Sequence, residues 1–138
     1  MGLVSLRFQA SASHVRTARL VAVTVARRAG FGEEQVEAVR QAVGEACALS
    51  VGRLGPDVQV TLTLDDAPQP PHGPDPSLAR LVARVGPLDV DGGVGSVGDL
   101  GLVVLAELTD HYAFEDAEPG GALRLTWLAR HQDPVRAD

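Results

Sequence analysis

Two spacings of hydrophobic residues occur along this chain, and the first is the spacing of amphipathic helices. Apolar residues three and four positions apart predict a helix that begins after Ser11 or Ser13 and ends at Gly30. A second stripe of the same period predicts a helix over 33–54, followed by a glycine and a proline. An almost wholly apolar segment predicts a third helix over 100–109.

The second spacing is alternation of apolar and polar residues, which indicates strands with one buried face. It predicts strands over five segments: 3–8, 58–64, 78–85, 112–114 and 122–128. We expect helices and strands in this order to form a two-layer α/β sandwich. In this arrangement three helices cover one face of a mixed, mostly antiparallel sheet.

Two segments are too rich in proline or glycine for regular structure. Five prolines fall within 65–77, which predicts a hairpin loop between two strands. Glycine and aspartate dominate 86–98, which predicts an irregular loop before the third helix. Neither segment has the character of a domain boundary, and 138 residues suit one core, so we expect a single domain over 1–138.

Composition narrows the class of partner and the compartment. The formal net charge of −6 argues against direct nucleic-acid binding, because neutralising phosphates needs a cationic surface. Cys47 is the only cysteine, so no disulfide framework forms, and no segment has the pattern of a signal peptide or a membrane span. We therefore expect a cytoplasmic protein that does not associate with membranes. The chain also contains no Lys, Asn or Ile, which indicates a GC-rich genome.

Three stretches follow one another in the order of a known family. Residues 39–47, VRQAVGEAC, are similar to its R-x-A-V-x-E-A-C-x-N-A helix, and a strand pair followed by a glycine-rich loop stands where it has a D-x-G-x-G turn and an ATP lid. Residues 99–105, DLGLVVL, are similar to its G-x-G-L-x-L-I segment, with Asp99 replacing the first glycine. The chain thus resembles the anti-sigma-factor serine kinases of the GHKL superfamily. This resemblance implies the histidine-kinase-like ATPase (Bergerat-type) fold.

The resemblance also identifies the positions at which the family performs its chemistry. Glu45 aligns with the general base, although an apolar helix stripe equally accommodates a carboxylate that snorkels or caps a loop. Leu49 aligns with the Asn that ligates Mg²⁺, and a leucine has no oxygen to offer a hard cation. Because the chain has no Asn, no shift of the alignment restores this ligand.

Two further positions that align with the family's nucleotide contacts also carry different residues. Arg84 aligns with the adenine-binding Asp, and Leu88 replaces the second glycine of the turn. Gly86, Gly98 and Gly101 remain as a candidate nucleotide loop, since glycine-rich backbone before a helix can hold anions. A flexible connector explains the same glycines. We therefore expect no bound cofactor, with ATP and magnesium binding weak if it occurs, and the spacing of the four histidines predicts no metal site.

By resemblance, the chain is expected to be a bacterial anti-sigma factor. It would sequester a sigma factor of RNA polymerase and be released by an anti-anti-sigma protein of the STAS type. Whether it is an enzyme stays open, because a degenerate site favours little or no ATP turnover. Two alternatives are an ATP-dependent serine kinase that phosphorylates the anti-anti-sigma partner, and a ligand-sensing domain on the same fold.

The first predicted helix is the candidate partner surface. Its residues Val15, Arg16, Arg19, Arg27 and Arg28 are expected to contact the partner, although a solvated basic face explains the same arginines. The resemblance further implies a homodimer formed through residues 3–28.

Overall fold

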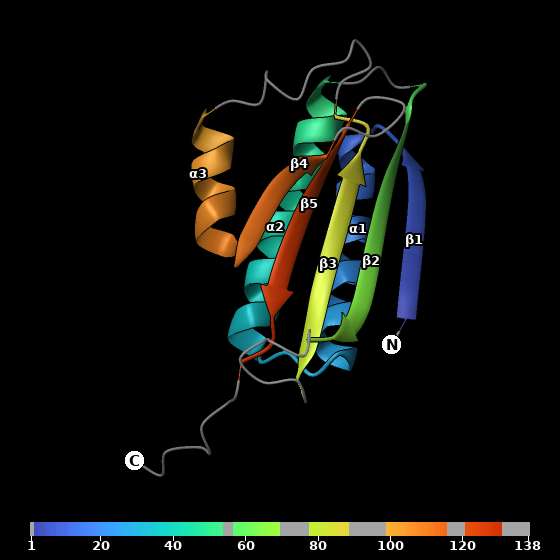
Figure 1. The fold of residues 1–138 in the computed structure, drawn as a ribbon. Helices are drawn as coiled ribbons and strands as arrows, with labels where there is room; N and C mark the ends of the chain where they lie inside the picture. The colour runs from blue at the N-terminus through green and yellow to red at the C-terminus, as the bar shows by residue number, and fades with distance from the viewer. Residues whose placement is uncertain (1, 54–56, 70–77, 89–98, 116–120, 131–138) are drawn as a thin grey trace.

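The computed structural model describes residues 2–53, 57–69, 78–88, 99–115 and 121–130. They form helices and strands in the predicted order (Figure 1): β1 (Gly2–Gln9), α1 (Ala12–Arg28), α2 (Glu33–Arg53), β2 (Gln59–Pro68), β3 (Ala79–Gly86), α3 (Asp99–Leu108), β4 (His111–Glu115) and β5 (Ala122–Leu128). None of these helices is long and apolar enough to cross a bilayer.

The strands form one sheet in the order β1-β2-β3-β5-β4. Every described neighbouring pair is antiparallel, so the predicted mixed, mostly antiparallel sheet has no parallel pair among the described strands. The register is set by burial, because Leu6 pairs with Leu62 and Leu62 pairs with Val85, which places their side chains on the same face.

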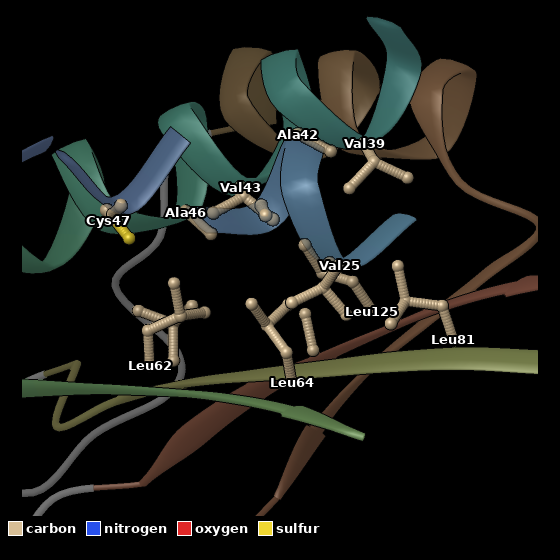
Figure 2. Close-up of a cluster of buried hydrophobic side chains, with 14 of the residues drawn as sticks. Val25, Val39, Ala42, Val43, Ala46, Cys47, Leu62, Leu64, Leu81 and Leu125 are labelled. Atoms are coloured by element: carbon tan, nitrogen blue, oxygen red, sulfur yellow. The ribbon is translucent and has the colours of Figure 1, made fainter. Parts of the chain in front are cut away.

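The helices lie against that apolar face. Helices α1 and α2 cross behind the strands in Figure 1, and α3 lies beside α2 at the β4 edge of the sheet. Figure 2 shows Cys47 and Val43 of α2 directed toward Leu62 and Leu64 of β2, and Val39 on the same side of α2 farther along the helix. All five side chains are fully buried, so the predicted two-layer sandwich with one apolar sheet face is confirmed.

The helix ends follow local chemistry. Ser11 precedes α1 with extended backbone, but its hydroxyl hydrogen-bonds to the Ser13 hydroxyl (3.0 Å) instead of capping the helix. After α1, Gly30 adopts φ +94°, and its amide donates to the Arg27 carbonyl (3.1 Å). A glycine suits this left-handed turn because it has no Cβ to clash, which explains why α1 ends there.

The proline-rich segment begins later than predicted. Strand β2 continues through Pro68, with Asp66 paired to Gly2 and Pro68 paired to Ala79, so 65–68 are strand and not loop. A proline is tolerated at a strand end because the ladder needs no amide there. The rest of the predicted loop, 70–77, lies outside the described residues, as do 89–98.

Candidate nucleotide site and partner surface

Glu45 and Leu49 lie one turn apart on the same side of α2. Glu45 is exposed and has no hydrogen-bond or ion-pair partner in the part of the chain that the structure describes. Leu49 is half-buried and packs against the core. The side chain one turn after the candidate base is therefore an aliphatic group that cannot ligate a metal ion.

The nearest hydroxyl on α2 cannot replace the missing ligand. Ser50 is fully buried, and its Oγ has no hydrogen-bond partner. A group without solvent access on the core side of the helix cannot reach an ion held between α2 and the nucleotide. Among the described residues, no group of three or more His, Cys, Asp or Glu side chains is placed to hold a metal ion.

At the end of β3, side-chain alternation sets the direction of Arg84, the residue that aligns with the family's adenine-binding Asp. Val85 is buried toward the helices, so its neighbour Arg84 points to the opposite face of the sheet. There the Arg84 Nε donates to Glu115 Oε1 at 3.1 Å. Neither Arg84 nor Val85 therefore places a carboxylate on the helix side of the sheet.

Gly86 is explained by close packing between strands. A Cβ placed on Gly86 would lie 2.7 Å from the Gly121 carbonyl oxygen, a distance that real side chains do not tolerate. Two residues later, Leu88 is 1% exposed and belongs to the core. These two positions of the candidate turn thus serve the packing of the sheet and the core.

Of the other two candidate glycines, one is described by the structure. Gly101 is half-buried in the first turn of this helix. Gly98 lies outside the described residues. The expectation that they form a nucleotide loop therefore stays a prediction.

Comparisons with known proteins identify the family of this domain. A sequence model of the histidine kinase-like ATPase domain matches residues 8–127, which is most of the chain. The chain belongs to this family. A search of the curated proteins gives no match.

A solved structure shows the same fold as this histidine kinase-like ATPase domain. It contains the RsbU and RsbW domains of Rv1364c from Mycobacterium tuberculosis, and superposes with a TM-score of 0.66 at 15% sequence identity. The match covers 99% of this chain and 35% of that one, so the chain spans about a third of the length of the protein it matches.

Two of the five residues predicted to contact a partner instead make contacts inside this ATPase-like domain. Val15 is 5% exposed and packs in the core, so we withdraw it from the contact surface: it lies on the apolar stripe that α1 buries. Arg27 donates from Nε and Nη2 to the Glu33 carboxylate (3.1 and 2.7 Å), which joins the end of α1 to the start of α2. These hydrogen bonds hold the pKa of Glu33 below its ordinary value.

Arg19 is half-buried between α1 and α2. A Cβ on Gly44 would lie 2.2 Å from Arg19 Nε, so the guanidinium occupies the space that this glycine leaves open. That Nε is buried without a hydrogen-bond partner. Beneath it, burial raises the pKa of the Cys47 thiol to about 12, so Cys47 is a neutral core residue at physiological pH.

The remaining candidates lie on an exposed ridge of α1. Arg16 and Arg28 are exposed and make no ion pair with any described residue. Between them at four-residue steps lie Leu20, which is 61% exposed, and Thr24. We call Arg16, Leu20, Thr24 and Arg28 the α1 ridge. Sequence reasoning missed Leu20, although its position off the apolar stripe of α1 was a usable signal.

A separate cavity lies at the other end of α2. It has a volume of about 160 Å³ and is lined by residues that include Glu34, Glu107 and Trp127. Glu34 lies fifteen residues before Leu49 in the same helix, about 20 Å away along its axis. This cavity is therefore distinct from the position where the family holds its nucleotide.

Proposed function

We propose that this chain is an anti-sigma factor that sequesters a sigma factor of RNA polymerase and is released by a STAS-type anti-anti-sigma protein, with little or no ATP turnover. The observation that carries the proposal is Leu49, an aliphatic side chain at the position of the magnesium ligand. Phosphoryl transfer depends on metal ions that neutralise the developing charge, so this domain lacks a central requirement for kinase activity.

Sequestering a partner needs a complementary surface and no chemistry, and the α1 ridge supplies one. Its exposed leucine lies between Arg16 and Arg28, which form no ion pair with a described residue. Arginine is enriched at protein–protein contacts, whose apolar centre is bounded by polar groups. The similarity in fold to a solved structure with an RsbW domain supports the proposed anti-sigma role, and the choice of surface depends on the α1 ridge itself.

A homodimer is part of the same proposal, formed at the β1 end of residues 3–28 so that the α1 ridge stays available to the sigma factor. Strand β1 is one of the two edge strands of the sheet, and its outer edge is unpaired among the described strands. Leu3 on this strand is 68% exposed. An edge with free backbone groups and exposed apolar side chains favours pairing with a second copy.

A serine kinase is the alternative, and Glu45 is the observation that favours it. This carboxylate is retained and exposed, as a base that meets a substrate must be. The kinase alternative requires that another group hold the magnesium ion, and among the described residues no group of three or more His, Cys, Asp or Glu side chains is placed to do so.

Recovery of the complex from the native host tests the proposal. The tagged chain is expected to copurify a sigma factor, and addition of the STAS-type protein from the same host should displace it. The purified sigma factor should bind the chain without nucleotide and then fail to bind core RNA polymerase. Failure of the chain to bind any sigma factor of the host, each tested in purified form, would refute the proposed function.

A further inference from the structure

The face of the sheet that points away from the helices carries four arginines from three strands. They are Arg7 on β1, Arg80 and Arg84 on β3, and Arg124 on β5. In Figure 1 this face is turned toward the viewer, and no described helix or strand lies in front of it. We call these four residues the arginine face.

Charge on this face is opposite in sign to the net charge of the chain. Among the described residues its carboxylates are Asp65 and Glu115, which gives four guanidinium groups and two acids, whereas the chain has a net charge of −6. Glu115 is shared by Arg84 (3.1 Å) and Arg124 (3.3 Å). Arg7, Arg80 and Asp65 form no ion pair with a described residue. Ion pairs among the described residues therefore neutralise only part of the positive charge of the arginine face.

Two donors of the arginine face also lack acceptors. The Nε atoms of Arg80 and Arg124 are buried and have no hydrogen-bond partner. Arg84 and Arg124 lie directly opposite each other in the β3–β5 register, so two cations share one carboxylate. Like charges in this arrangement repel each other, and buried N–H groups without acceptors are unfavourable. Additional carboxylates bound to the half-exposed guanidinium groups of Arg84 and Arg124 would relieve the repulsion between them.

The side chains between these arginines are short, which leaves the face open to a broad contact. Thr63, Val82 and Thr126 lie in the neighbouring positions of β2, β3 and β5, and all are half-buried. A guanidinium group presents a planar fork that binds a carboxylate through two hydrogen bonds. Arginines on an open sheet face with short neighbouring side chains thus suit a partner that presents several Asp and Glu side chains.

We propose that the arginine face is a second docking surface of this domain, and that its occupant is an acidic segment of a partner protein. Carboxylates of this segment bind Arg7 and Arg80 and complete the hydrogen bonding of Arg84 and Arg124. The α1 ridge belongs to the helix layer on the other side of the sheet, so both surfaces can be occupied at once. This inference does not depend on the proposed function.

A labelled peptide of alternating Asp and Glu tests this inference by fluorescence anisotropy. The chain is expected to bind it, with affinity falling as salt is added. Replacing Arg7→Gln together with Arg80→Gln should raise Kd about tenfold or more, because neither arginine forms an ion pair with a residue that the structure describes. Replacing Arg16→Gln together with Arg28→Gln removes the same charge from the α1 ridge and should change Kd less than about threefold.

Equal losses in the two double variants would show unspecific attraction and overturn the inference. Absence of peptide binding would also overturn it, as would tighter binding of a duplex DNA at the same salt concentration. Because Arg80 is partly buried, Arg7→Gln alone is the second variant: Arg7 is exposed, so its loss leaves folding intact and should still weaken peptide binding. Circular dichroism of each variant confirms that it is folded.

Discussion

Replacement of Leu20 by glutamate is expected to weaken binding of the sigma factor at least about tenfold. Leu20 is 61% exposed on the α1 ridge, so the change leaves the core untouched. A buried contact would lose its apolar anchor, and the new carboxylate would enter the interface without a guaranteed partner. Isothermal titration of the purified sigma factor into Leu20→Glu and the unchanged chain gives the ratio of Kd values.

Val103 on α3 provides the matched control. It is 59% exposed, so Val103→Glu introduces the same charge at a similarly exposed apolar position outside α1. We expect Val103→Glu to bind the sigma factor as the unchanged chain does. If Leu20→Glu binds equally well, the α1 ridge is not the contact surface. If both variants lose affinity equally, the effect comes from charge and not from position.

Gly86→Ala is expected to lower the free energy of unfolding by about 1–3 kcal/mol. The added Cβ would lie 2.7 Å from the Gly121 carbonyl oxygen and 3.3 Å from the Ala122 Cβ, so β3 and β5 would have to move apart. The opposing group is backbone, which cannot move out of the way as a flexible side chain can. Urea denaturation followed by circular dichroism measures the difference.

Gly2→Ala is the control for this prediction. A Cβ on Gly2 meets nothing within 4 Å, although Gly2 also lies in a strand of the same sheet. We expect Gly2→Ala to change the free energy of unfolding by less than about 0.5 kcal/mol. Unchanged stability in Gly86→Ala would contradict the packing role and favour the nucleotide loop as the reason for this glycine.

The helices and strands could be predicted because each has a strong local pattern. Strand β5 was predicted with its observed bounds, since Leu123, Leu125 and Trp127 alternate with polar residues and are all buried. The bounds of α2 were also predicted closely. Its apolar stripe and the Gly–Pro pair that follows it are both local features. The family could be recognised because its motifs lie in these regular elements.

Other features depended on residues distant in the sequence. The need for glycine at 86 comes from the backbone of Gly121, and the hydrogen bond of Arg84 is made to Glu115 on another strand. The extension of β2 to Pro68 also required knowledge of its pairing with β1 and β3.

The prediction for Val15 was wrong for a local reason. Helical periodicity already placed Val15 in the apolar stripe of α1, whereas its neighbour Arg16 is exposed, yet both were predicted to contact the partner.

Thermal unfolding of the chain with ATP plus Mg²⁺, compared with ATP plus a chelator, measures whether magnesium strengthens nucleotide binding. We expect the same Tm in both conditions, because Leu49 offers no ligand through which magnesium could strengthen nucleotide binding. Binding at about one hundred times Kd would stabilise the fold by about 2.7 kcal/mol, which corresponds to several degrees. A rise in Tm of that size that requires magnesium would show that the site still holds Mg-ATP and that Leu49 does not abolish metal binding.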